Sequence, residues 1–241
     1  MSFLIFFVPV FVHGQAVAGS RKQALELPDT SGSVILSFMM GGGSGFEQHE
    51  LGYTNDDKVI EISAGGGVGI GFHAGYLITH QLEVEVEVAY LTASLSQVLE
   101  NAEGSFDRSL FAGNVLYRIP VSRRGKVLIG GGAGYFAGGK MDLDFSGASN
   151  IGGAHNIYDY DNAIGFQIRC IFELFGKGGR FSKHLSVGMG LQYTSVHYNL
   201  KSVSSNSVDI PLSQLPGSLK TEFGEVDGSG ADLLLYVCYY L

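Results

Sequence analysis

The sequence is poor in several kinds of residue, and each shortage narrows the class of protein. It has no tryptophan, five prolines and two cysteines, and only 16% of its 241 residues are charged, against about 25% in typical soluble domains. Two cysteines do not make a disulfide framework. The chain also lacks an apolar run of roughly 20 residues, the length that a membrane-spanning helix needs. A disulfide scaffold and an ordinary soluble enzyme both fit this composition poorly.

Glycine and aromatic residues are abundant instead. The chain has 36 glycines, 12 tyrosines and 16 phenylalanines, which fits a membrane β-barrel better than a soluble enzyme. Its net charge is −8, so we expect no nucleic acid as partner, because phosphate binding needs a basic face. Cys170 and Cys238 fall on different predicted strands that a third strand separates, so both are predicted to be free thiols.

The stretch from Ile60 to Thr92 gives the clearest structural signal. Its second half, LEVEVEV (82–88), alternates apolar and acidic residues without a break, and period two is typical of a strand with one apolar and one polar face. The first half alternates as well, with residues 60, 62, 64, 68, 70, 72, 74 and 76 on the apolar face, and with Glu61, His73 and several glycines on the other. A short connection at 79–81 makes this a hairpin. Each arm is long enough to cross a bilayer as a tilted strand of about 9–11 residues.

The same alternation predicts six more strands. They lie at residues 32–40, 108–119, 127–138, 162–175, 184–198 and 229–241. With the hairpin they make eight, an even number as in bacterial outer-membrane barrels. The predicted fold is therefore all-β, an eight-stranded antiparallel up-and-down transmembrane β-barrel.

The connections alternate between long and short, and the charges follow the same division. Long connections are predicted at 42–58, 96–107, 140–160 and 200–227, where most acidic residues lie, and short basic turns at 120–126 and 176–183. Outer-membrane barrels have longer extracellular loops and short periplasmic turns. We therefore expect the acidic loops to face the outside and the basic turns to face the periplasm.

The N-terminal segment is predicted to be a targeting signal. Residues 2–12 form an apolar run of about the length of a signal-peptide core, although no lysine or arginine precedes it, and Ala16-Val17-Ala18 supplies a small-x-small cleavage pattern. A buried N-terminal strand is the alternative. The predicted organisation is a signal peptide over residues 1–18, a polar lead-in over 19–30 and the outer-membrane barrel domain over 31–241.

Three stretches carry a family resemblance: the glycine-rich segment 65–71, the hairpin GYLITHQLEVEVEVAY (75–90) and the C-terminal segment ADLLLYVCYYL (231–241). With them the chain resembles, over residues 31–241, the small eight-stranded outer-membrane barrels of the OmpA, OmpX and opacity-protein type. The resemblance implies a place in the bacterial outer membrane, in contact with its lipid, and we expect a monomer. The chain departs from the family at Leu241, where the family usually has an aromatic residue.

The inward charged residues are the sharpest candidate for a site. Three glutamates of the predicted hairpin share the face of the neighbouring glycines, and two arginines on other strands are their natural partners. The interior of an eight-stranded barrel is just wide enough for side chains to fill it, so we interpret the set as a charge-paired plug, with a narrow gated pore as the alternative. We predict no catalytic, cofactor-binding or metal-ligating residue and no cofactor. The predicted lumen charge network is Glu83, Glu85, Glu87, Arg118, Arg169 and Glu173.

Two further groups of polar residues have weaker functional interpretations. The strand around His197 resembles faintly the histidine strand of the outer-membrane lipid A deacylase family, but Asn199 occupies the position of that family's serine nucleophile, and Ser195 lies two residues before the histidine. Two Asp-x-Asp pairs, at 142–144 and 159–161, flank one loop and could converge on Ca²⁺. Strand extensions with one solvated face explain these aspartates more simply.

The predicted function is that of an integral outer-membrane barrel with a charge-plugged lumen and long acidic extracellular loops, in a structural or surface-interaction role and without enzymatic activity. A small ion-conducting porin is the first alternative, and an outer-membrane lipid-modifying enzyme is the second. A soluble lipocalin-like carrier is disfavoured because the apolar side faces outward. The expected partners are outer-membrane lipid and, through the long loops, an extracellular ligand.

Overall fold

The computed structural model describes residues 32–53, 59–95, 103–122, 124–145, 154–176 and 184–241. The signal peptide predicted over residues 1–18 and the polar lead-in predicted over 19–30 lie outside these ranges.

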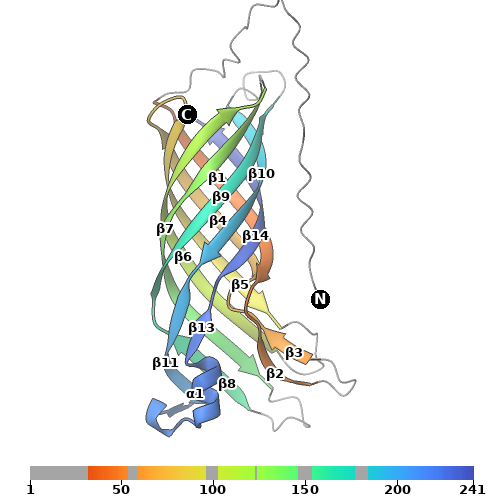
Figure 1. Ribbon diagram of the computed structural model, residues 1–241, viewed down its shortest axis with the longest axis vertical. Coiled ribbons are helices and arrows are strands. Elements are labelled where there is room, and N and C mark those ends of the chain that lie inside the picture. The colour runs from red at the N-terminus through yellow and green to blue at the C-terminus, as the bar shows by residue number, and fades with distance from the viewer. Residues whose placement is uncertain (1–31, 54–58, 96–102, 123, 146–153, 177–183) are drawn as a thin grey trace, which may run out of the picture.

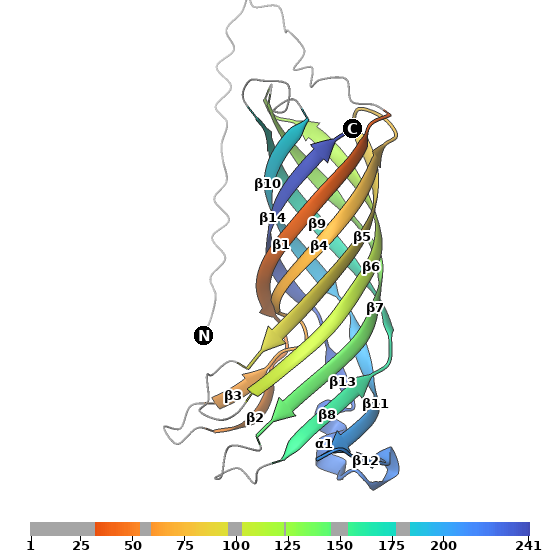
Figure 2. The same ribbon diagram turned by 180° about the vertical axis from the view of Figure 1, so that it is seen from behind.

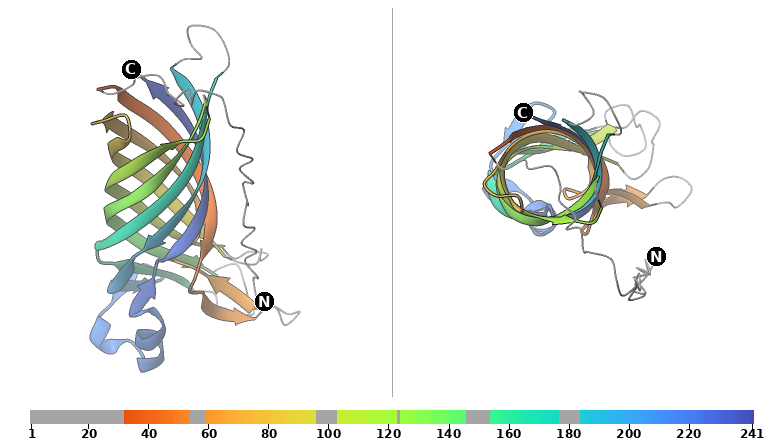
Figure 3. Two further views of the ribbon diagram at one scale, coloured as in Figure 1. Left: turned by 45° about the horizontal axis from the view of Figure 1, so that its top comes forward. Right: turned by 90° about the horizontal axis from the view of Figure 1, so that it is seen from above.

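Eight strands form a closed antiparallel barrel, seen from the side in Figure 1 and along its axis in the right-hand view of Figure 3. Each strand pairs with its neighbours in chain order, and β1 closes the ring by pairing with β14. The predicted eight-stranded up-and-down fold is therefore confirmed. The barrel strands are β1 (Val34–Gly45), β4 (Gly67–Leu77), β5 (Leu82–Ser94), β6 (Glu103–Pro120), β7 (Gly125–Asp144), β9 (Ala163–Phe175), β10 (Leu185–Ser195) and β14 (Gly230–Tyr240).

The outward face of the barrel is apolar. Alternate residues of the barrel strands are exposed, among them Val86 (62%), Ile168 (54%) and Leu191 (64%). Outer-membrane barrels carry an apolar band of this kind, flanked by two girdles of aromatic residues. Exposed tyrosines lie at two such levels, near the short turns at Tyr76, Tyr117 and Tyr239, and towards the opposite end at Tyr90, Tyr135 and Tyr193.

Beyond the second tyrosine level the sheet continues as a folded region, here called the extension (Figure 2). The end of β7 pairs with β8, and β8 pairs with β11. The predictions of long loops at 140–160 and 200–227 were therefore wrong over the residues that the structure describes, because these segments add strands and short helices. In the part of the chain that the structure describes, no helix is long and apolar enough to cross a membrane. The additional elements are β2 (His49–Tyr53), β3 (Val59–Ile62), β8 (His155–Tyr160), β11 (His197–Ser205), β12 (Val208–Ile210), η2 (Leu212–Gln214), α1 (Gly217–Phe223) and β13 (Glu225–Asp227).

An aromatic core holds the extension together. Phe106 and Tyr198 are both fully buried (0% exposed), and their ring centroids lie 5.5 Å apart. Tyr160 packs against Phe106 at 5.8 Å, and Phe223 of α1 packs against Tyr158 at 4.9 Å. Aromatic pairs at these distances stabilise a core by more than their buried area alone. The extension is thus a packed structure with its own apolar interior.

One strand of the predicted hairpin is shorter than the sequence suggested. Ile60 and Ile62 were expected on the outward face of β4, but they lie on the separate strand β3 and are only 1% exposed. A glycine-containing turn separates β3 from β4. Gly67 has a φ of +112°, a backbone conformation that residues other than glycine rarely adopt. A Cβ atom at Gly67 would also lie 2.0 Å from the carbonyl oxygen of Thr92. Unbroken alternation in the sequence did not reveal this turn.

The two cysteines are free, as predicted. Cys170 is exposed on the outward face of β9, whereas Cys238 is buried on β14. Strand β10 pairs with both β9 and β14 and so separates the two thiols.

Candidate functional site

The barrel interior holds a network of buried charged and polar side chains, here called the lumen network. Its members come from seven of the eight barrel strands, all except β1, and each is less than 9% exposed. They occupy inward positions because side chains alternate along a strand, and the outward positions are apolar. Two groups can be distinguished by their contacts: one near the short turns and one near the middle of the barrel.

The group near the short turns contains two ion pairs that share one tyrosine. Arg118 Nε donates to Glu83 Oε2 at 2.8 Å, and Lys126 Nζ lies 3.2 Å from Glu173 Oε1. The hydroxyl of Tyr240 donates to Glu173 Oε1 at 2.6 Å and accepts from Arg118 Nη2 at 3.0 Å. Lys126 also donates to this hydroxyl. Two carboxylates and two cations thus form a closed cluster with no charge left over.

The middle group is built around Arg169, which is fully buried. Its Nη1 donates to Glu85 Oε1 at 2.7 Å, its Nη2 binds Glu87 Oε2, and its Nε donates to Gln192 at 2.6 Å. Gln167 Nε2 also donates to Glu87 Oε2, at 2.7 Å. A buried charge is costly unless it is paired and hydrogen-bonded. The guanidinium of Arg169 meets both requirements through partners on β5 and β10.

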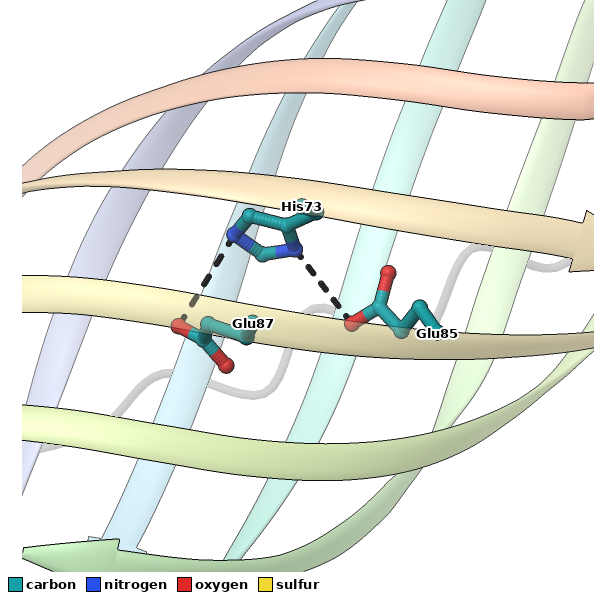
Figure 4. A group of neighbouring side chains, drawn as sticks. All are labelled: His73, Glu85 and Glu87. Carbon is teal, nitrogen blue, oxygen red and sulfur yellow. Dashed lines mark ion pairs between the residues drawn. The ribbon is translucent and has the colours of Figure 1, made fainter.

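His73 adds a ring between the two glutamates of the middle group (Figure 4). It projects from β4, while Glu85 and Glu87 project from the neighbouring β5. His73 Nδ1 lies 3.4 Å from Glu85 Oε1, and Nε2 lies 3.7 Å from Glu87 Oε1. The ring packs edge-on against Tyr236, with 5.6 Å between the centroids, which holds its plane in place.

Two further buried charged residues, Arg108 and Asp232, belong to the lumen network. Arg108 on β6 is 2% exposed and donates through Nη2 to the backbone oxygen of Gly65 at 3.0 Å. Its guanidinium also lies 5.9 Å from the ring centroid of Phe106, at the border of the aromatic core. Asp232 on β14 is a buried acid, 5% exposed. Arg108 therefore marks the level at which the charged interior gives way to an apolar one.

The structure places all six predicted network residues inside the barrel. Glu83, Arg118 and Glu173 meet in the group near the short turns, and Glu85, Glu87 and Arg169 meet in the middle group. Arg118 and Arg169 therefore serve separate groups. Glu61, which was expected on the same face of the hairpin as His73, lies on β3 in the extension instead.

Sequence reasoning missed four acidic or basic members of the network: Arg108 and Asp232 near the aromatic core, and Lys126 and His73. Lys126 was assigned to a basic turn at the membrane surface, but it lies on β7 directly opposite Glu173 of β9 and is fully buried. His73 was seen on the glycine-rich face without being connected to the glutamates. In the register of β4 and β5, His73 lies directly opposite Glu87. The length of the hairpin connection predicts this register, so the pairing could have been found from the sequence.

The other candidate residues lie in the extension and do not form comparable groups. His197 is exposed on β11, and its Nδ1 lies 3.7 Å from Asp227. Asp142 binds Lys140 at 2.9 Å and His155 at 2.8 Å on the solvated face of β7 and β8. Among the described residues, the Asp-x-Asp pairs do not bring three potential metal ligands together. They fit the interpretation as strand extensions with one solvated face.

Comparisons with known proteins agree with this architecture. The family model described as outer membrane protein beta-barrel domain matches residues 36–210. The crystal structure of the outer membrane protein OprG from Pseudomonas aeruginosa is similar at 12% identity, with a TM-score of 0.53, over 88% of this chain and 97% of that one. No curated protein sequence gives a significant match.

Two further solved structures are similar at lower scores. Neisserial surface protein A has 12% identity and a TM-score of 0.45, over 86% of this chain and 95% of that one. Ail, the attachment invasion locus protein of Yersinia pestis, has 10% identity and a TM-score of 0.42, over 88% and 99%.

Proposed function

Because the chain belongs to the family of outer membrane protein beta-barrel domains, we propose that it is a closed barrel whose lumen network blocks conduction and whose extension acts at the cell surface. The protein resides in the bacterial outer membrane, and its apolar outward face contacts lipid. The proposal assigns the membrane-spanning part an anchoring role and the extension a structural or surface-interaction role, without enzymatic activity.

The observation that carries the proposal is the continuous cross-linking of the lumen by side chains. Arg169 of β9 binds two glutamates of β5, and Arg118 of β6 donates to the hydroxyl of Tyr240 on β14, so both contacts join strands that are not neighbours. An eight-stranded barrel leaves an interior that side chains can fill. A hydrated ion moving along the axis would have to displace buried, paired charges, and this opposes conduction.

The extension supplies the exposed surface for an interaction. Acidic residues lie on many of its described elements, namely β2, β7, β8, β12 and β13. Basic residues are fewer there and include Lys140, Lys201 and Lys220. An acidic surface attracts cationic partners and repels anionic ones. We therefore expect an extracellular ligand, if the extension binds one, to carry net positive charge. Barrels in lipid nanodiscs should bind a lysine-rich peptide better than a glutamate-rich peptide of equal length, and the reverse preference would contradict this expectation.

Conductance across planar lipid bilayers tests the closed lumen. The wild-type protein should show no steady single-channel current. Arg118→Ala should produce a cation-selective leak, because it removes a side chain that fills the lumen and leaves Glu83 without its cation. Arg124→Ala is the matched control, since Arg124 is exposed in the short turn. A large steady current through the wild type would refute the closed lumen and support a porin.

A further inference from the structure

The middle group of the lumen network contains two buried atoms that face each other and lack hydrogen-bond partners. They are Nε2 of His73 and Oε1 of Glu87, which are 3.7 Å apart. Their side chains are 2% and 0% exposed. We propose that this pair is a binding site for a divalent transition-metal ion, with His73 Nε2 and Glu87 Oε1 as ligands and Glu85 as the residue that orients the imidazole.

The two oxygens of Glu87 are used very differently. Oε2 accepts hydrogen bonds from Arg169 and Gln167, with Asn114 Nδ2 at 3.4 Å. Oε1 accepts none and points at the imidazole. Leaving a buried carboxylate oxygen without a partner costs free energy, and a cation at Oε1 removes this cost. Glu87 would then lie between Arg169 and the metal ion and bind one with each oxygen.

The two ring nitrogens of His73 also differ in their contacts: Nδ1 lies near a carboxylate of the network, and Nε2 has no hydrogen-bond partner. Nδ1 lies 3.4 Å from Glu85 Oε1, a position from which it can direct its hydrogen at that carboxylate. Arg169 Nη1 is also 3.4 Å from Nδ1, but it donates to Glu85 at 2.7 Å. Metal-ligating histidines almost always direct the other ring N–H at a carboxylate, a carbonyl or water, which leaves the ligating nitrogen unprotonated. With Nδ1 protonated, the lone pair of Nε2 faces an oxygen of Glu87, and two acceptors need a cation between them.

The separation of the two atoms fits a metal ion better than a direct hydrogen bond. Two ligands bound tetrahedrally at about 2.1 Å lie about 3.4 Å apart, close to the 3.7 Å observed. A direct N–H···O hydrogen bond places its heavy atoms about 2.7–3.2 Å apart. The ring and the carboxylate therefore need to move less to bind a metal ion than to bind each other.

The charges inside the barrel leave room for an additional cation. The buried residues of the barrel interior include five acids, Glu83, Glu85, Glu87, Glu173 and Asp232, but only four arginine or lysine residues, Arg108, Arg118, Lys126 and Arg169. The group near the short turns is balanced by its own pairs, and the middle group contains two glutamates and one arginine. The deficit of positive charge therefore lies where His73 and Glu87 meet.

Space and ligand chemistry restrict the kind of ion. A small cavity of about 10 Å³ adjoins Glu87, Gln192 and Asp232, enough for about one water molecule. Oε1 of Gln167 is a further buried atom without a partner in the same group. One imidazole nitrogen with carboxylate and water oxygens suits Zn²⁺ or Co²⁺, whereas Ca²⁺ takes six to eight oxygen ligands.

Metal retention by the refolded barrel tests the site. The protein is refolded in detergent with Zn²⁺ or Co²⁺, passed over a desalting column and analysed by elemental mass spectrometry. The wild type should retain one ion per barrel, and His73→Gln and Glu87→Gln should retain none. Glu85→Gln should weaken binding about 10–100-fold, as expected for a carboxylate that orients a metal-binding histidine. His197→Gln, a change at an exposed histidine of the extension, should retain the ion fully.

Three results would overturn the proposal: a wild type without bound metal, equal retention by His73→Gln, or Ca²⁺ retained in place of Zn²⁺. Folding of each variant is checked by its faster migration on gels without heating. Nitrogen NMR of the His73 ring tests the site in the wild-type protein without any substitution. Zn²⁺ should shift the Nε2 resonance to that of a metal-bound neutral imidazole. A doubly protonated ring that Zn²⁺ does not affect would mean that a proton, not a metal ion, supplies the missing charge.

Discussion

The barrel interior and the interior of the extension share strands β6 and β7 but have opposite chemistry. On β6, Arg118 and Asn114 point inward among charged partners, whereas Phe106, further along the same strand, points inward into the aromatic core. The outward face changes in the opposite sense, from the exposed Val115 to the hydrogen-bonded Asp107. Strand alternation sets which residues share a face, and the medium around each part decides which face is apolar.

We attribute this reversal to the proposed surroundings, with lipid around the barrel and water around the extension. In the bilayer an outward polar side chain would lose its hydrogen bonds, so the polar residues occupy the lumen and must pair with one another. Above the bilayer the outward face meets water, and burying the apolar residues inside becomes favourable. Removing a buried ion pair should therefore destabilise the barrel, whereas removing a buried aromatic ring should destabilise the extension.

The largest effect is expected from removing the cation of the middle group. Arg169→Ala leaves Glu85, Glu87 and the oxygen of Gln192 without their shared donor. Breaking a buried pair by removing one partner typically costs about 3–5 kcal/mol, because the other charge remains buried and alone. We expect a loss of this size in the free energy of unfolding measured by urea titration in lipid vesicles. Arg124→Ala, an exposed turn residue, should leave the midpoint unchanged, and equal midpoints for the two variants would show that the pairing is unimportant.

A loss of about 3 kcal/mol is expected from emptying the aromatic core of the extension. Phe106→Ala removes a fully buried ring that contacts Tyr160 and Tyr198, and such truncations cost about 3–5 kcal/mol where the site cannot collapse. Hydrogen exchange should accelerate at amides of β8 and β11 while those of β4 and β5 stay protected. Phe166→Ala, at a residue on the outward face of β9 that is 49% exposed, is the control and should not have this effect. Acceleration throughout the barrel would mean that the two interiors unfold as one.

An arginine on the outward face should report where lipid ends. Val86 and Ser94 lie on the same face of β5, but Ser94 lies beyond Tyr90, towards the extension. Val86→Arg should cost about 2–4 kcal/mol in lipid, and Ser94→Arg about 0–1 kcal/mol, because the penalty falls towards the interface. Folding free energies in vesicles measure both. A neutral Val86→Arg would show that the lipid-facing side has been assigned backwards.

The sequence predicted features that depend on alternation and missed those that depend on three-dimensional packing. The eight strands, the inward glutamates and the outward valines of β5 follow from period two. Lys126 was placed at the surface because it adjoins two arginines in a short turn, although its side chain points inward to Glu173. The break at Gly67 and the fold of the extension depend on close approaches between distant strands, which a local pattern does not contain.

The smallest effect is expected at the solvated face of the extension, where Asp142 binds Lys140 and His155. Partial burial opposes ionisation of Asp142, but hydrogen bonds from both partners outweigh it and lower the pKa of its carboxyl. The hydrogen bond to Asp142 raises the pKa of Lys140. A group with a lowered pKa adds stability above its unfolded value, about 3.9 for aspartate, and the added stability is lost as the pH falls through the folded pKa. The lysine adds stability below its unfolded pKa, about 10.4, and this is lost as the pH rises through its folded pKa.

Asp142→Asn should therefore flatten the acid side of the pH profile of the extension without changing the barrel. The side chains of Lys140 and Asp142 are 42% and 29% exposed, so solvent screens the pair and its contribution should stay below about 1 kcal/mol. Protection of the β7 and β8 amides against hydrogen exchange, followed from pH 6 downward, should fall in the wild type below about pH 4 and stay nearly constant in the variant.

Asp161→Asn, at an exposed aspartate just past β8, is the matched control and should keep the wild-type profile. An acid-dependent loss of the same size in Asp142→Asn would mean that other carboxylates govern this edge. In that case the ion pair of Asp142 on the outer face of the extension would add no measurable stability, unlike the buried pairs inside the barrel.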